Sequence, residues 1–334
     1  MGLAAYLFFT PSGCGFLAYL NFDQLVKRVY VPFKGKCSCI TYVGKLECGW
    51  PIDTILSLLI QLWYASDTGT QTRAASAMGT WTPPWSGWTA CCPAPGARLR
   101  DLPTFIRTMN ADDTKLSINI KQCELDAPAA DGILLNTFDA LERRAVEAVG
   151  ACLPNTFTVG PLGAPDLPYL PGLISSLWRD DDRCAAWLDG HAEEGDASVV
   201  YVNFGSITMD EFAWGLAAAG CPFLWVVRPD MVRCGGSVLP DGFEAAVAGR
   251  GLMVGWCDQE AVLAHRATVG LLSHCGWNST LESVRAGVPM LCWPFFAEQV
   301  INCRYVCDEW GVGMEMPCDC MRRGGPRWRR RSGS

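Results

Sequence analysis

Short apolar runs alternate with amphipathic stretches along the second half of the chain. From Ala197 onward, SVVYVNFGS, PFLWVVRP, GLMVGW, TVGLLSHCG and VPMLCWP predict strands, and EFAWGLAAAG, a segment around Ala261 and NSTLESVRAG predict helices. Near-continuous apolar strands separated by helices are typical of a parallel sheet that is covered on both faces. The pattern therefore predicts an α/β fold, in which ligands bind at the carboxyl ends of the strands.

The first half carries fewer signals of regular structure. Residues 1–20 have no charge, but Pro11–Gly13 interrupt them and no basic residues precede them, so they predict a buried strand, a turn and a helix that continues through Lys27 rather than a signal peptide. ADGILLNTFDALERRAVEAV predicts a strand ending near Asn136 and then a helix. The apolar run 55–63 is too short to cross a bilayer, so we expect a cytoplasmic protein that is not integral to a membrane.

Two segments depart from these patterns. Residues 65–97 are rich in Ala, Thr, Gly, Ser and Pro without a period, which indicates an irregular insertion. The arginine-rich residues 318–334 indicate an unstructured tail; nucleic-acid binding or targeting is less favoured, because nothing before them is basic. Closely spaced prolines after residue 160 indicate a connection between domains. The predicted division is a first domain over 1–160, a connection over 161–196, a second domain over 197–317 and the tail.

Composition narrows the class of protein. The chain has 334 residues, of which 50% are hydrophobic and 18% charged, as expected for a globular protein of about two domains. A net charge of -7 disfavours nucleic acid as a partner. The 18 cysteines form no CxxC pair, and no histidine lies at zinc-ligand spacing from a cysteine pair. We therefore expect buried, reduced thiols and no metal site. We also expect a monomer.

The segment SHCGWNSTLESVRAG combines several ligand-binding signals at one strand end. Gly276 allows a ligand to approach the backbone, and Asn278 or Ser279 is expected to cap the following helix. The start of such a helix suits a diphosphate. Glu282, one turn later, can accept hydrogen bonds from a ribose diol, and Gly287 is suited to end the helix.

The flanks of this segment identify a family. From Trp256 to Gln299 the sequence resembles the signature of plant UDP-dependent glycosyltransferases, and AWGLA, CWPFFAEQ, INCRYVCDEWGVGMEM and RLRDLPTFIRT are most similar to the subgroup with cyanohydrin and other small-acceptor glucosyltransferases. The resemblance covers residues 1 to about 45 and 97–316. The matching positions are Trp256, Gln259, His265, the run HCGWNS, Leu281, Glu282, Gly287, Val288, Pro289, Trp293, Pro294 and Gln299.

This resemblance implies a GT-B type fold, with two facing Rossmann-like domains, and a UDP-sugar donor without a metal or other cofactor. It places the uracil against Trp256, with Cys257 and Gln259 at base and ribose, and the ribose hydroxyls on Glu282. The phosphates would be held by His274, Asn278, Ser279 and Ser206, beside Gly276.

The resemblance also implies the sugar and the reaction. Trp277, Glu298 and Gln299 would bind the sugar hydroxyls, and glutamine at the last position resembles glucose-using members, so UDP-glucose is the expected donor. The implied reaction transfers a hexose, with inversion, to a hydroxyl of a small lipophilic acceptor of plant secondary metabolism, such as a flavonoid, terpenoid or cyanohydrin.

The resemblance assigns no catalytic residue here. Family members use an early histidine as base, oriented by an aspartate, and the resemblance begins downstream of both; the chain's histidines are His191, His265 and His274. We therefore expect an incomplete N-terminal domain in a truncated product. The alternative function is an inactive UDP-sugar-binding fragment.

Other residues carry structural alternatives. His265 is expected to pack or hydrogen-bond at a helix end, His191 to lie in a charged surface loop, and Trp293 to be core as readily as sugar wall. Asp258 replaces the usual proline after Cys257, which puts a negative charge near a dianionic ligand.

Overall fold

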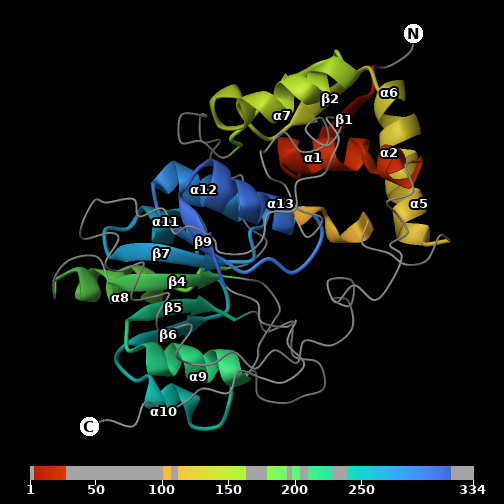
Figure 1. Cartoon of the computed structure of the whole chain (residues 1–334). Helices are drawn as coiled ribbons and strands as arrows, with labels where there is room; N and C mark the ends of the chain where they lie inside the picture. The colour runs from red at the N-terminus through yellow and green to blue at the C-terminus, as the bar shows by residue number, and fades with distance from the viewer. Residues whose placement is uncertain are drawn as a thin grey trace, which may run out of the picture.

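The computed structural model describes residues 4–27, 101–106, 112–162, 179–193, 198–203, 210–227 and 239–316 (Figure 1). The predicted insertion 65–97 and the predicted tail 318–334 lie outside these ranges. Within the described ranges the strands form two parallel sheets, which confirms the predicted α/β class.

The larger sheet is built from the second half of the chain. Its strand order is β6-β5-β4-β7-β8-β9, and every neighbouring pair is parallel. The strands are β4 (Val199–Asn203), β5 (Phe223–Val226), β6 (Gly251–Val254), β7 (Thr268–Ser273), β8 (Met290–Cys292) and β9 (Gly313–Glu315). The helices are α8 (Arg183–Glu193), α9 (Asp210–Ala219), α10 (Phe243–Ala246), α11 (Gln259–Ala264), α12 (Trp277–Ala286) and α13 (Gln299–Arg304), which continues into the π-helical turn η5 (Tyr305–Glu309).

Both faces of this sheet are buried because its strands are apolar at successive positions. Val200 and Val202 of β4 pack into one core cluster with residues of α9 and α10. Val199 and Tyr201 point to the opposite face and pack with residues of α8 and α11. The strands and helices predicted from the alternation after Ala197 are therefore confirmed, whereas α10, α13 and β9 were not predicted, and α8 lies inside the predicted connection.

The smaller sheet has the order β1-β2-β3 within the described residues. Its strands are β1 (Tyr6–Phe9), β2 (Gly132–Leu135) and β3 (Thr156–Thr158). The elements around it are α1 (Gly13–Leu20), α2 (Phe22–Lys27), the 3-10 turn η2 (Thr104–Ile106), α5 (Thr114–Lys121), the π-helical turn η3 (Gln122–Asp126), α6 (Ala127–Ala129) and α7 (Asp139–Cys152).

The expectation that the first strand is buried was wrong. Tyr6 is 56% exposed and Phe8 44% exposed, while Leu7 and Phe9 pack against the core. The reason is that β1 has only β2 as a described neighbour, and side chains on alternate positions of a strand point to opposite faces. The predicted strand near Asn136 and the helix after it are confirmed as β2 and α7.

Helix α13 joins the two parts of the described structure. Ile301 belongs to the core that contains α1 and α7, whereas Cys303 packs in the core of the larger sheet. Asn302 between them accepts a hydrogen bond of 2.6 Å from the Ser12 hydroxyl. Figure 1 shows α13 between α1 and the larger sheet. No helix among the described residues has the length and apolar character required to cross a membrane.

Candidate functional site

Polar side chains gather where β4 and β7 end at the carboxyl edge of the larger sheet. Asn203 is the last residue of β4 and pairs in register with Ser273, the last residue of β7. His274 follows directly, and α12 begins three residues later at Trp277. This edge is where parallel α/β sheets bind ligands, as the sequence predicted.

The Gln259 side-chain amide connects three elements at this edge. Its Oε1 accepts hydrogen bonds from Asn203 Nδ2 at 2.7 Å and from the Tyr201 hydroxyl at 3.2 Å. Its Nε2 donates to Glu282 Oε2 at 2.5 Å and to Ser279 Oγ at 3.0 Å. Gln259 therefore fixes α11 against β4 and α12 and sets the position of the Glu282 carboxylate.

Glu282 is held partly away from water on α12. Burial raises the pKa of its carboxyl group, and the hydrogen bond from Gln259 acts in the opposite direction. A half-buried carboxylate with a fixed orientation can accept hydrogen bonds from a diol, which is the chemistry that the sequence predicted for this position.

The turn before α12 is shaped by three successive residues. Cys275 adopts a left-handed conformation with φ 63°, which is uncommon for a residue with a side chain. Gly276 is the N-cap, and a Cβ added to it would lie 2.7 Å from His274 Nε2. The helix begins at Trp277, one residue before the earlier of the two predicted caps, because the Thr280 N–H already bonds to the Gly276 carbonyl. Its first N–H groups are left without helical acceptors, and Gly287 ends it with φ 69° as predicted.

The residues predicted to bind the sugar are partly engaged within the protein. Trp277 is buried, and its indole N–H donates to the Asn136 carbonyl at 2.6 Å. Gln299 Oε1 accepts the N–H groups of Phe295 and Phe296. The half-buried Glu298 accepts a hydrogen bond of 3.0 Å from the Tyr19 hydroxyl. Glu298 and Gln299 thus lie together at the start of α13, while the Trp277 indole points to the smaller sheet.

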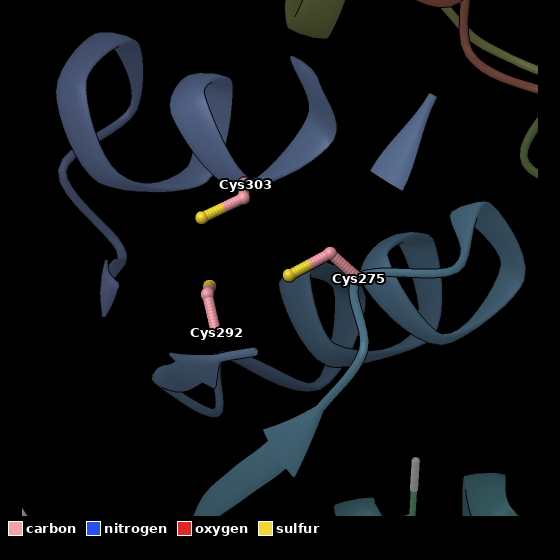
Figure 2. A group of neighbouring side chains, drawn as sticks. All are labelled: Cys275, Cys292 and Cys303. Carbon is pink, nitrogen blue, oxygen red and sulfur yellow. The ribbon is translucent and has the colours of Figure 1, made fainter. Parts of the chain in front are cut away.

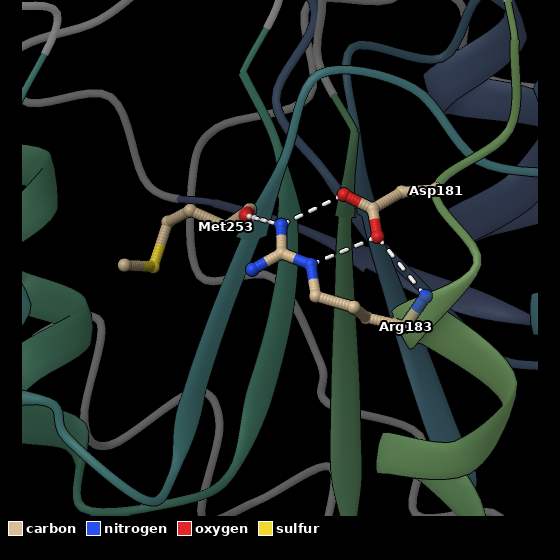
Figure 3. A network of polar contacts seen from close by, with 3 residues as sticks. All are labelled: Asp181, Arg183 and Met253. Atoms are coloured by element: carbon tan, nitrogen blue, oxygen red, sulfur yellow. Dashed lines mark hydrogen bonds and ion pairs between the residues drawn. The ribbon is translucent and has the colours of Figure 1, made fainter.

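The chain around Trp256 is tied to the start of α8. The Trp256 carbonyl accepts the Asp181 N–H at 3.1 Å. Arg183 holds the Asp181 carboxylate through Nε at 2.9 Å and Nη2 at 2.7 Å, and also donates to the Met253 carbonyl (Figure 3). Hydrogen bonds from Arg183 lower the pKa of Asp181. This network positions the half-buried Trp256, which the sequence predicted to stack on a base.

The Cys257 side chain is buried on the other side of this turn. Its thiol lies 3.5 Å from the Tyr201 hydroxyl and next to Cys184, inside the core of the larger sheet. A contact of Cys257 with a base would therefore involve its backbone. Asn278 is exposed, Ser279 is half-buried, and Ser206 lies outside the described residues.

Asp258 has a structural role that the sequence comparison did not anticipate. Its carboxylate is the N-cap of α11 and accepts the Ala261 N–H at 3.1 Å. The acidic residue therefore satisfies an N–H group at a helix N-terminus.

We expect Asp258→Ala to lower the free energy of unfolding by about 1 kcal/mol, because the Ala261 N–H loses its acceptor. Asp258→Asn keeps an acceptor and removes the charge, so its stability should match that of the parent protein. Urea unfolding followed by circular dichroism measures both variants. Equal stability of the alanine variant and the parent would contradict the capping role.

The remaining candidates are structural. His265 accepts the Ala267 N–H at Nδ1, so its Nε2 carries the proton and donates to Asp189 at 3.2 Å, which confirms the predicted role at a helix end. Trp293 is 3% exposed and stacks with Phe212 in the core. His191 lies in the last turn of α8 against Trp187, so its placement in a loop was wrong.

Two polar residues of this site were not singled out from the sequence. Asn203 and Tyr201 both bond to Gln259. The available signal was an asparagine and a tyrosine hydroxyl in the otherwise apolar run VVYVN, at the edge where ligands bind.

Comparisons with known proteins agree with this architecture. Residues 165–322 match the family described as UDP-glucoronosyl and UDP-glucosyl transferase. UDP-glycosyltransferase 85A2 of Arabidopsis thaliana is 39% identical over 96% of this chain and 60% of its own length. Linamarin synthase 1 of Manihot esculenta is 38% identical, also over 96% of this chain and 60% of its own length. The chain thus spans about 60% of the length of these relatives.

Solved structures show the same fold. Phytolacca americana UGT2, complexed with UDP-2fluoro-glucose and pterostilbene, aligns with a TM-score of 0.61 and 27% identity over 94% of this chain and 58% of its own. Os79 of O. sativa in complex with UDP aligns with a TM-score of 0.63 and 26% identity, over 94% of this chain and 60% of its own. With the matching sequence signature and the GT-B arrangement of parallel sheets, these comparisons show that the chain is similar, over nearly its whole length, to plant UDP-glycosyltransferases.

Proposed function

We propose that the carboxyl edge of the larger sheet binds UDP-glucose. The observation that carries the proposal is the Glu282 carboxylate, held by Gln259 beside the start of α12. A carboxylate suits the ribose diol and the adjoining helix start suits the diphosphate, so this one edge offers a partner for each part of a nucleoside diphosphate.

The other proposed contacts follow the order base, phosphates and sugar. Trp256 stacks on the uracil, with the backbone of Cys257 at the base. The phosphates lie near His274, Gly276 and the helix start, with Asn278, Ser279 and Ser206 as further donors. The glucose extends toward α13, where Glu298 and Gln299 contact its hydroxyls, and Trp277 contributes through its backbone, because its indole N–H is engaged by Asn136.

The proposed reaction transfers the hexose to a hydroxyl of a small lipophilic acceptor with inversion. The acceptor oxygen bonds to the anomeric carbon while the bond to the β-phosphate oxygen breaks. UDP leaves with the electron pair, and the acceptor proton passes to a base. We assign no base within this chain, since His191 and His265 are structural and His274 faces the phosphates. We also propose that the protein is cytoplasmic and monomeric.

The proposal is tested with the purified chain, UDP-glucose and a panel of phenols, terpenoid alcohols and cyanohydrins. Glucoside formation, detected by mass spectrometry, supports transfer. Saturable UDP binding by calorimetry without any glucoside supports the alternative of a UDP-sugar-binding protein. A folded chain that binds no UDP contradicts both functions.

We expect Glu282→Gln to weaken UDP binding by about 10- to 100-fold, because a charged hydrogen-bond acceptor for the ribose is lost. The variant should also discriminate less between UDP and 2′-deoxy-UDP than the parent. Titration calorimetry with both nucleotides measures this. Glu260→Gln is the matched control, since Glu260 lies on α11 and pairs with Arg285 instead. Retained discrimination in a folded Glu282→Gln protein would contradict the ribose contact.

A further inference from the structure

Several cysteine side chains converge behind the His274 turn. The sulfur atoms of Cys275, Cys292 and Cys303 all lie within 4.8 Å of one another (Figure 2). The Cys307 sulfur is 4.0 Å from that of Cys303. Four separate elements supply these thiols: the turn after β7, the end of β8, α13 and η5.

The surroundings of this cluster are apolar and closed to water. Cys275 and Cys292 are fully buried, Cys303 is 3% exposed, and all three lie in the core between the larger sheet and its helices. The Cys275 turn is fixed from outside the cluster, because Asn302 Nδ2 donates to the Cys275 carbonyl at 3.0 Å. The ligand atoms that this cluster can provide to a metal ion are therefore cysteine sulfurs.

The sulfur spacing matches the size of a thiolate-bound ion. A tetrahedral site with Zn–S bonds of about 2.3 Å places its sulfurs about 3.8 Å apart. The spacings among Cys275, Cys292 and Cys303, and that between Cys303 and Cys307, exceed this value by 1.0 Å or less, a difference that small side-chain rotations can cover. Oxygen-preferring cations such as Mg²⁺ and Ca²⁺ do not suit a sulfur-only ligand set, whereas thiolates select soft d10 ions.

We propose that Cys275, Cys292 and Cys303, with Cys307 as the fourth ligand, form a binding site for Zn²⁺. Each Zn–S bond replaces an S–H bond, and the released proton passes to solvent. The expectation of no metal site rested on the lack of a CxxC pair and of a histidine at zinc-ligand spacing. These ligands are spread over the chain from Cys275 to Cys307 and meet only in the fold. Because Cys275 stands between His274 and Gly276, a bound ion also fixes the turn at the head of α12.

The test uses the full, reduced, metal-stripped chain. On titration with Co²⁺ as a spectroscopic probe, we expect sulfur-to-cobalt charge-transfer absorption that saturates, and one equivalent of Zn²⁺ should displace it. The double variant Cys292→Ala, Cys303→Ala should lose one equivalent of bound metal. Cys184→Ala is the matched control, since Cys184 is also buried and its thiol lies beside Cys257, outside the cluster, and it should retain the metal.

If the double variant does not fold, measurements on the parent protein still test the proposal. Saturating Zn²⁺ should raise the melting temperature by about 4 °C or more. Alkylation during partial unfolding, mapped by mass spectrometry, should show zinc-dependent protection of the four cluster cysteines. Absence of charge-transfer absorption, equal metal content in the double variant, or protection confined to other cysteines such as Cys318 and Cys320 overturns the proposal. None of these readouts depends on UDP, so the outcome is independent of the proposed function.

Discussion

Replacing Gly276 by alanine is expected to weaken UDP binding by about 100-fold or more. The new Cβ would lie 2.7 Å from His274 Nε2, a distance that ordinary side chains do not adopt, so the imidazole must move. His274 lies at the proposed diphosphate site, so moving its imidazole removes its hydrogen bonds to the phosphates, and the new methyl group occupies space at the start of α12. Two bonds to a charged group, at about 1.5 kcal/mol each, account for this loss.

Titration calorimetry with UDP measures the effect, and circular dichroism checks the fold. Gly150→Ala is the matched control, because outside its own helical turn no atom lies within 4 Å of its added Cβ, and its UDP affinity should equal that of the parent. A folded Gly276→Ala protein with unchanged affinity would show that the phosphates do not approach this turn.

Replacing Arg304 by methionine is expected to lower the free energy of unfolding by about 3–5 kcal/mol. Arg304 Nη1 lies 3.2 Å from Asp101 and 2.9 Å from Asp308, and the side chains of Arg304 and Asp101 are only 5% and 7% exposed. The substitution leaves the buried Asp101 carboxylate without this cation. Because Asp101 and Arg304 are more than 200 residues apart, the loss also weakens the packing of α13 against the first part of the chain.

Urea unfolding gives the stability of this variant. Arg285→Met is the control, since its pair with Glu260 is partly exposed and should contribute no more than about 1 kcal/mol. Adding Asp101→Asn to Arg304→Met should recover part of the loss, because the buried charge disappears together with its partner. A single variant no less stable than Arg285→Met would contradict this account.

Much of the larger sheet was predictable from local sequence. Runs such as VVYVN and TVGLLS have apolar residues at successive interior positions, which is typical of strands buried on both faces. The short elements were harder to predict. Strand β9 has only three residues, too few to show a period. Helix α8 does carry apolar residues at helical spacing, but it follows a proline-rich segment and was therefore assigned to the connection.

The site was predictable to the extent that it is continuous in the chain. Gly276, Glu282 and Gly287 lie within one strand-turn-helix unit, whose geometry is set by backbone conformation. The role of Asp258 was not predictable from the family pattern, because a cap is recognised only when the start of its helix is known.

The sequence by itself determined the parallel α/β architecture, the resemblance to a family and the segment expected to bind UDP, because these depend on hydrophobic period and on residues close together in the chain. Only the tertiary structure decided which polar groups remain available there. The Trp277 indole is engaged by Asn136, 141 residues away, and Glu298 is bonded by Tyr19, 279 residues away. It alone brought together the cysteines of the proposed zinc site, since contacts between distant segments arise from packing, which spacing along the chain does not encode.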